Sequence, residues 1–229
     1  MNNEVRRALF IAPCALFIAV AVSCATFGRL GMADCPAAKT RCLALFPAAM
    51  WRTLHEINVD AMGRKTSLLG LTIGDPATRR LRATLMTVEG LTLFDATVGP
   101  KGVTIHRALP PLDASAFSAG LLADVQAIFL SPPGTLLSEG CRRDGVAICR
   151  FWTRDNGTVE IDAAADGSAV WRVFDETDRL FKEIDFAPPR PDGFSPAIAV
   201  KSPGIPGYSL GLKLLEAESG VSVENAFVP

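Results

Sequence analysis

Between His55 and Ile105, apolar and polar residues alternate in short runs that are separated by turn residues. In the first run, Ile57, Val59 and Ala61 fall on one face, and polar side chains fall on the other. Alternation with a period of two is typical of an antiparallel strand with one buried face. Glycine, proline and aspartate between the runs supply the turns. The pattern predicts strands near 55–61, 67–73, 81–85, 94–98 and 103–105.

The period changes after the two prolines at 110–111. Apolar residues then recur every three or four positions, as on one face of a helix. Asp124 and Gln126 are the main polar residues of the opposite, exposed face. Prolines at 132–133 end the pattern, because proline cannot continue a helix. We predict one strong helix near 114–130, with an apolar stripe made of Phe117, Leu121, Leu122, Val125, Ile128 and Phe129.

The second half of the chain returns to short strand-like runs. They lie near 146–154, 158–163, 169–174 and 180–186, and Asn-Gly and Asp-Gly pairs between them are typical of tight hairpins. The stretch 187–207 is rich in proline, and we interpret it as an extended connection. Two further runs, 208–215 and 221–227, are expected to complete the sheet.

About ten or eleven strands are more than the ~8 that close a small barrel filled by its own side chains. We therefore expect a mainly β fold, in which the antiparallel meanders curl into a sandwich or barrel with space left inside and the helix closes the opening. Apolar faces arranged in this way enclose a pocket that shields a hydrocarbon chain from water. The alternative is that the same faces pack on one another and leave no pocket. The expected pocket residues are Ile57, Val59, Leu69, Leu71, Ile73, Leu81, Leu85, Phe94, Phe117, Leu121, Val125, Phe129, Trp152 and Trp171.

Residues 1–24 have the features of an export signal. Arg6 and Arg7 precede an uncharged run that is shorter than the ~20 residues of a membrane span. The run ends in Val-Ala-Val-Ser-Cys, which resembles a bacterial lipobox and makes Cys24 the predicted lipidation site. Ordinary cleavage near Cys24 and an uncleaved anchor remain alternatives. The expected domains are the signal at 1–24, a tether with a short helical segment at 25–50, and the half-barrel at 51–229.

Four further cysteines, Cys35, Cys42, Cys141 and Cys149, would remain in the exported chain. In an oxidising compartment they suit two disulfide bridges, for which three connectivities exist. Proximity in the sequence favours Cys35–Cys42 and Cys141–Cys149, and buried free thiols are the alternative. Neither pair has zinc-finger spacing or a nearby histidine, so we expect no metal site.

Composition narrows the function classes. The hydrophobic fraction is 49%, the charged fraction 21% and the net charge −1. These values exclude a disordered chain and argue against a nucleic-acid partner, which requires a basic surface. The two histidines, His55 and His106, are accompanied by no serine or cysteine in a nucleophile-elbow motif. We therefore expect neither an enzyme nor a cofactor.

The chain resembles the LolA/LolB-type lipoprotein carriers in its lipobox, its two strand meanders, the helix containing residues 121–126 and its proline-rich late segment. It is most similar to the uncharacterised LolB-like lipoproteins found with aryl-polyene biosynthesis genes. The resemblance implies an antiparallel, unclosed half-barrel of about ten or eleven strands, with one main helix as its lid. It also implies an outer-membrane lipoprotein facing the periplasm, since Ala25 and not aspartate follows the lipobox cysteine. Its cargo would be a lipid, or an acylated or polyene amphiphile, received from a LolA-like periplasmic carrier.

The loop after the third predicted strand departs from this family. LolB-type proteins project a leucine toward the membrane there, whereas this loop reads Val88-Glu89-Gly90-Leu91, with Glu89 at about the place of that leucine. A carboxylate resists burial in lipid. Val88 and Leu91 are therefore the candidate membrane contacts. The leading hypothesis is an outer-membrane-anchored amphiphile carrier, and the alternative is a structural or interaction lipoprotein of the envelope with a filled barrel.

Overall fold

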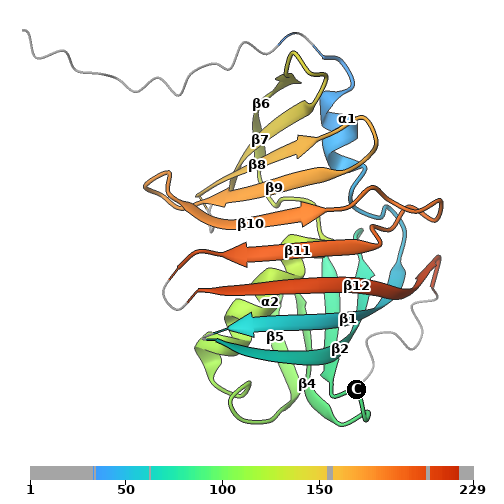
Figure 1. The fold of residues 1–229 in the computed structure, drawn as a ribbon, viewed down its shortest axis with the longest axis vertical. Coiled ribbons are helices and arrows are strands. Elements are labelled where there is room, and N and C mark those ends of the chain that lie inside the picture. Colours follow the sequence, from blue (N-terminus) through green and yellow to red (C-terminus); the bar gives the residue numbers. More distant parts are fainter. Residues whose placement is uncertain (1–32, 34, 62, 154–156, 205–206, 222–229) are drawn as a thin grey trace, which may run out of the picture. The chain divides into compact units, whose positions relative to one another are not determined.

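The residues that the structure describes form one antiparallel sheet of twelve strands (Figure 1). The computed structural model describes residues 33, 35–61, 63–153, 157–204 and 207–221. The predicted signal with Cys24, the first part of the tether and most of the predicted strand 221–227 lie outside these residues.

Two meanders make up the sheet. The first consists of β1 (Trp51–Ala61), β2 (Arg64–Asp75), β3 (Arg80–Met86), β4 (Thr92–Gly99) and β5 (Gly102–Ala108). The second consists of β6 (Thr135–Cys141), β7 (Ala147–Thr153), β8 (Gly157–Ala163), β9 (Ala169–Phe174), β10 (Leu180–Phe186), β11 (Ala197–Ser202) and β12 (Tyr208–Ser219). Pairing of β1 with β12 joins the meanders into one sheet.

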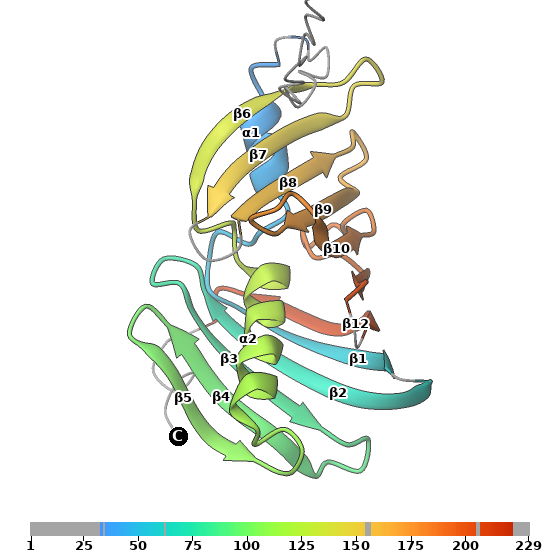
Figure 2. The ribbon, with the colours of Figure 1, turned by 90° about the vertical axis from the view of Figure 1, so that its left-hand side faces the viewer.

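The edge strands of the sheet, β5 and β6, are neighbours in the sequence but do not pair with each other. The helix α2 (Ser115–Phe129) connects them and lies against the first meander (Figure 2). A shorter helix, α1 (Ala38–Leu43), packs on β6, β7 and β8. The strands and the one main helix are those that the sequence pattern predicted, and the unclosed sheet is the one that the family resemblance implied.

Alternating burial defines the inner face of the first meander. Every second residue of β3 and β4 is buried, which places Leu81, Ala83 and Leu85 beside Phe94 and Ala96. Directly opposite residues of an antiparallel pair share one face of the sheet. The inner face is thus continuous across these strands.

The inner face of β2 is formed by Leu68, Gly70, Thr72 and Gly74. Gly74 pairs with Trp51, and a Cβ on this glycine would lie 2.3 Å from the indole ring. The indole of Trp51 on β1 therefore requires a glycine at position 74 on β2. The prediction that Leu69 and Ile73 point inward was wrong, since their register partners Glu56 and Arg52 belong to the outer face. Leu71 lines both the inner cavity and the outer hollow that are described below.

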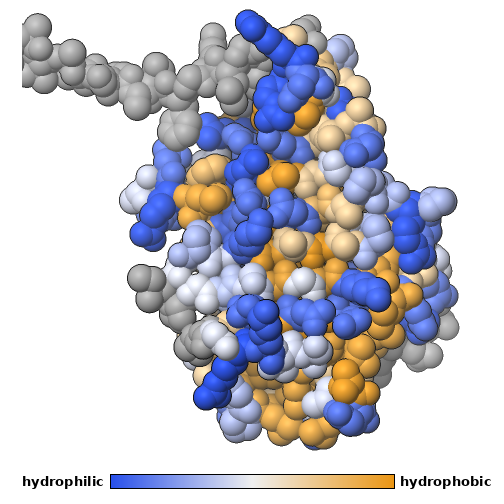
Figure 3. All heavy atoms as spheres, in the orientation of Figure 1, coloured by the Kyte–Doolittle hydropathy of each residue, from blue (hydrophilic) through white to orange (hydrophobic). Residues whose placement is uncertain are grey.

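The outer face differs between the two meanders. On the second meander, Arg172 lies 3.2 Å from both Asp162 and Glu183, and Lys201 lies 3.2 Å from Asp185. Figure 3 shows mainly hydrophilic residues over this upper part of the sheet and a gathering of hydrophobic residues over the lower part.

Two disulfides attach α1 and its preceding residues to the second meander. Cys35 is bonded to Cys141 and Cys42 to Cys149, with Cα–Cα distances of 5.4 and 6.3 Å. The pairing of sequence neighbours was therefore wrong, because α1 packs against β7 and places Cys42, and Cys35 just before the helix, beside strands about a hundred residues away. A bridge that closes a loop of this length stabilises a fold by about 5 kcal/mol in the chain-entropy model.

Two strands, β6 and β11, were not predicted as strands. The segment of β11 lies within the proline-rich stretch, but its six residues Ala197–Ser202 contain no proline. Proline removes a backbone donor only at its own position. A short strand therefore forms between Pro196 and Pro203 and pairs with β10 and β12.

Candidate functional site

A small cavity lies between α2 and the inner face of the first meander. Its volume is about 70 Å³. It is lined almost entirely by apolar atoms, from residues on β1, β2, β3, β12 and α2: His55, Ile57, Val59, Leu68, Gly70, Leu71, Thr72, Ala83, Thr84, Leu85, Leu210, Leu212, Leu121, Asp124, Val125, Ile128 and Phe129.

Cross-strand pairs build the sheet wall of this cavity. Ile57 lies opposite Leu212, and Val59 opposite Leu210, where β1 joins β12. On the other side of β1, Gly70 leaves room for Ile57, since a Cβ there would lie 2.4 Å from its Cδ1 atom. The wall is therefore apolar across three adjacent strands.

The lid side of the cavity comes from one face of α2. Leu121, Val125, Ile128 and Phe129 recur at helical spacing and face the sheet. Phe129 packs on the rings of Trp51 and His55, with centroid distances of 5.1 and 5.5 Å. The C-terminal end of α2 is thus fixed to the start of β1 by aromatic contacts.

In this structure α2 lies close to the sheet and leaves only a small cavity beneath it. An apolar cavity of about 150 Å³ holds a benzene ring, and sites for larger ligands occupy about 300–1,000 Å³. A space of about 70 Å³ is too small for an acyl chain. A hydrocarbon guest would fit only after α2 moves away from the sheet.

Asp124 connects the lid to the second meander by polar contacts. Its Oδ1 atom accepts a hydrogen bond from Nζ of Lys182 on β10, and its Oδ2 atom accepts one from the hydroxyl of Tyr208 on β12. The side chains of Asp124 and Lys182 are both buried. Burial and the neighbouring carboxylate raise the pKa of Tyr208, so its hydroxyl keeps the proton that it donates.

Comparisons with known proteins address the fold. No protein-family model matches the sequence, and no curated protein matches it. A DUF1329 family protein from Desulfovibrio piger is 12% identical, with 85% of this chain and 97% of that chain covered and a TM-score of 0.53. A LolA superfamily protein from Nitrosomonas europaea is 12% identical, with 86% and 98% covered and a TM-score of 0.52.

A third solved structure, from Vibrio parahaemolyticus, is described as an outer membrane lipoprotein-sorting protein domain. It is 10% identical, with 82% of this chain and 93% of that chain covered and a TM-score of 0.51. The alignments cover 97%, 98% and 93% of these three solved chains, so the similarity extends over nearly the whole of each fold. The chain has the LolA-like fold.

Of the residues that were predicted to form the pocket, half are found in the lining of the cavity. They are Ile57, Val59, Leu71, Leu85, Leu121, Val125 and Phe129. The predicted pocket set lacked Leu68, Ile128, Leu210 and Leu212, which also line the cavity. The alternation of Leu210 and Leu212 within the run 208–215 was the available signal for β12.

The other predicted pocket residues lie elsewhere. Leu69 and Ile73 belong to the outer face, while Leu81 and Phe94 are fully buried in the core. Trp171 packs against Phe46 in the second meander, with ring centroids 5.3 Å apart. Two more are half exposed, Phe117 at the first turn of α2 (50%) and Trp152 on β7 (48%). Strand and helix periodicity places residues on a face but does not show which part of that face is left hollow.

Burial of His55 changes its chemistry. Desolvation lowers the pKa of this side chain from 6.5 to about 4, so the imidazole is neutral at physiological pH. A neutral ring suits its position beside Phe129 in the apolar lining. Burial explains this shift without a catalytic partner.

The β3–β4 turn exposes two apolar side chains. Val88 is 59% and Leu91 50% exposed, and backbone hydrogen bonds between Thr87, Gly90 and Leu91 close the turn. A hydrogen bond from Thr87 lowers the pKa of Glu89, so this carboxyl is charged at neutral pH. The turn therefore presents one anion between two exposed hydrophobic groups.

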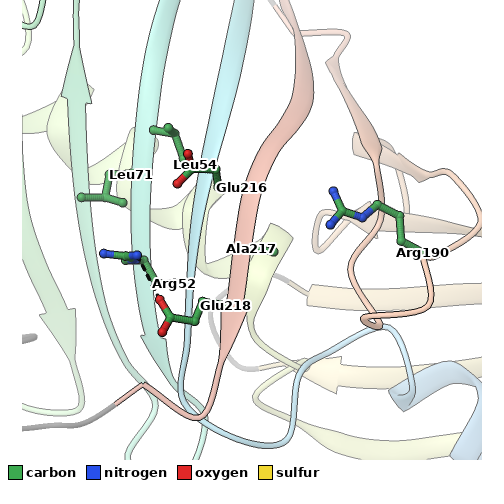
Figure 4. A pocket seen from close by; sticks show the side chains of 7 residues that line it. All are labelled: Arg52, Leu54, Leu71, Arg190, Glu216, Ala217 and Glu218. Atoms are coloured by element: carbon green, nitrogen blue, oxygen red, sulfur yellow. Dashed lines mark ion pairs between the residues drawn. The ribbon is translucent and has the colours of Figure 1, made fainter.

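A larger hollow of about 470 Å³ opens on the outer face (Figure 4). Arg52 and Glu218 form an ion pair of 2.9 Å at its side, and Arg190 and Glu216 also line it. Charged groups in this number are unfavourable neighbours for hydrocarbon. The outer hollow is therefore a poor site for an acyl chain, despite its size.

The described residues contain no cluster of three or more side chains with metal-binding chemistry. Among the helices in this part of the chain, none is long and apolar enough to cross a membrane.

Proposed function

We propose that this chain is a non-enzymatic, outer-membrane-anchored carrier of an amphiphile. It binds an acylated or polyene-type molecule, or the acyl chains of a lipoprotein, between α2 and the inner face of the first meander. The apolar cavity beneath the helix that connects the two edge strands carries this proposal. The LolA-like fold supports it, since two solved structures with this fold are described as a LolA superfamily protein and a lipoprotein-sorting domain.

The proposal extends to delivery of the amphiphile to the outer membrane. Lipid on Cys24 would hold the half-barrel at the periplasmic face of the outer membrane, and a LolA-like periplasmic carrier would be the donor. Val88 and Leu91 would contact the membrane, with the charged Glu89 limiting how deeply the turn enters it.

The test measures amphiphile bound to the purified full chain by mass spectrometry. Leu68→Trp fills the cavity, whereas Leu69→Trp adds the same ring to the outer face of the same strand. We expect the native chain and Leu69→Trp to carry a stoichiometric amphiphile, and Leu68→Trp to carry much less. Equal loading of the two variants would contradict a carrier site in this cavity.

The small volume of the cavity favours one second candidate, a structural or interaction lipoprotein of the envelope with a filled barrel. This candidate predicts that the native chain carries no amphiphile and that neither tryptophan variant changes that result.

A further inference from the structure

Three polar side chains interrupt the apolar inner face of the sheet. Lys182, Ser202 and Tyr208 lie on the adjacent strands β10, β11 and β12, and Ser202 is the direct register partner of Tyr208. Lys182 and Ser202 are buried. A buried ammonium group is unfavourable unless an anion and hydrogen bonds compensate it.

The compensating anion comes from the lid. Asp124 is the only charged residue of α2, and its two carboxylate oxygens accept hydrogen bonds from Lys182 and Tyr208. Asp124 also lines the cavity, so the ammonium group of Lys182 and the hydroxyl of Tyr208 meet their anion at the cavity wall.

Opening the cavity has an electrostatic consequence. The hydrocarbon tail fits only if α2 moves off the sheet, and this motion withdraws Asp124 from Lys182. The ammonium group then remains on an apolar wall without its partner, next to the hydroxyl of Tyr208. A guest that brings its own anion to this position removes the penalty, and a neutral guest does not.

We propose that Lys182 and Tyr208 bind the anionic head of the carried amphiphile, a carboxylate or a phosphate monoester, in place of the Asp124 carboxylate. The tail of the same molecule then lies in the cavity beneath α2. This inference rests on the proposed carrier function and specifies its ligand as an amphiphile with an anionic head.

The experiment uses the full chain in phosphatidylcholine vesicles and three photoreactive probes with one shared diazirine-bearing tail. Their heads are a carboxylate, a phosphate monoester and a neutral alcohol. For each variant, covalent labelling by an anionic probe is divided by labelling by the alcohol. This ratio cancels differences between variants in folding and in the mobility of the lid. The two anionic probes distinguish a fatty-acid source from a phosphate source. Lys201→Met is the matched control, since this lysine lies on the neighbouring strand but points outward to Asp185.

We expect the native chain to prefer the better anionic probe over the alcohol by about tenfold, as for a hydrogen bond to a charged group. Lys182→Met reduces that ratio to about one, while Lys201→Met leaves it unchanged. Asp124→Asn raises the ratio, because it removes the competing carboxylate. If the ion pair is merely structural, Lys182→Met and Asp124→Asn each change labelling by all three probes in the same direction, and the ratio between probes stays the same.

A double variant covers the case in which Lys182→Met fails to fold. Replacing both members of a buried ion pair by apolar residues is often tolerated, and Lys182→Met with Asp124→Leu is expected to bind the alcohol but lose the anion preference. An acid-to-alcohol ratio and a phosphate-to-alcohol ratio that are both near one in the native chain would overturn the head-group assignment alone. Absence of labelling by all three probes would overturn the carrier function as well.

Discussion

The ring of Phe129, at the end of α2, packs on the ring of Trp51, the first residue of β1, with centroids 5.1 Å apart. Both side chains are buried, whereas Phe117 at the other end of the same helix is half exposed. The lid is therefore held unevenly. We expect α2 to pivot about its C-terminal end, and the first turn of the helix to separate from the sheet first.

The first prediction compares the two ends of the lid. Phe129→Ala removes a buried ring and should lower the unfolding free energy by about 3–5 kcal/mol. Phe117→Ala, at the exposed end, should change it by only about 0.5 kcal/mol. Urea unfolding of both variants checks this difference. Similar losses for the two variants would show that the helix is held equally along its length.

The second prediction concerns the glycines of β2. Gly74→Ala forces a methyl group against the ring of Trp51 and should destabilise the fold by about 1–3 kcal/mol. Gly211→Ala on β12 is the control, since no atom lies within 4 Å of the added Cβ. Thermal unfolding measures both. A neutral Gly74→Ala would mean that Trp51 is not confined by this glycine.

The third prediction is a dependence of stability on pH. His55 has a pKa of about 4 when folded and 6.5 as its ordinary value, so the unfolded chain binds the additional proton between these values. Stability should therefore fall as the pH decreases from 6.5 to 4, with a contribution from His55 of about 3 kcal/mol. Urea unfolding at pH 7, 5 and 4 of the native chain and of His55→Leu isolates this contribution. Parallel pH profiles for the two proteins would contradict it.

The fourth prediction is the disulfide connectivity. Trypsin separates all four cysteines, because Lys39 and Arg41 lie between the first two and Arg142 and Arg143 between the last two. Under non-reducing conditions, mass spectrometry should detect the peptide with Cys35 linked to the one with Cys141. A peptide that joins Cys35 to Cys42 would contradict the position of α1 on the second meander.

Alternation of apolar residues predicted most strands, because a half-buried strand requires that pattern whatever its partners are. The three-to-four-residue period predicted the helix, and the family resemblance implied the unclosed sheet. The alternation assigned Leu69 and Ile73 of β2 to the wrong face, since the inner positions beside them are held by Gly70 and Gly74, which make room for Ile57 and Trp51 of the neighbouring strand. This relationship depends on register, which short runs of residues do not specify.

The polar residues of the site were harder to predict for a related reason. Asp124 was expected on the exposed face of the helix, but it is buried against Lys182 and Tyr208, which follow it by 58 and 84 residues. Helical periodicity treats a carboxylate as a surface group. Only the tertiary structure shows that a distant lysine compensates it. The disulfide pairing depended in the same way on packing between distant segments.

The position of a bound tail tests the carrier account most directly. The full chain, labelled with a tail-diazirine amphiphile and digested, would be analysed by mass spectrometry for the residues that carry the adduct. The account predicts adducts on cavity residues of α2 and β1, such as Leu121 and Ile57, and none on Leu54 in the outer hollow. Adducts confined to the outer face, with the cavity residues unlabelled, would contradict it.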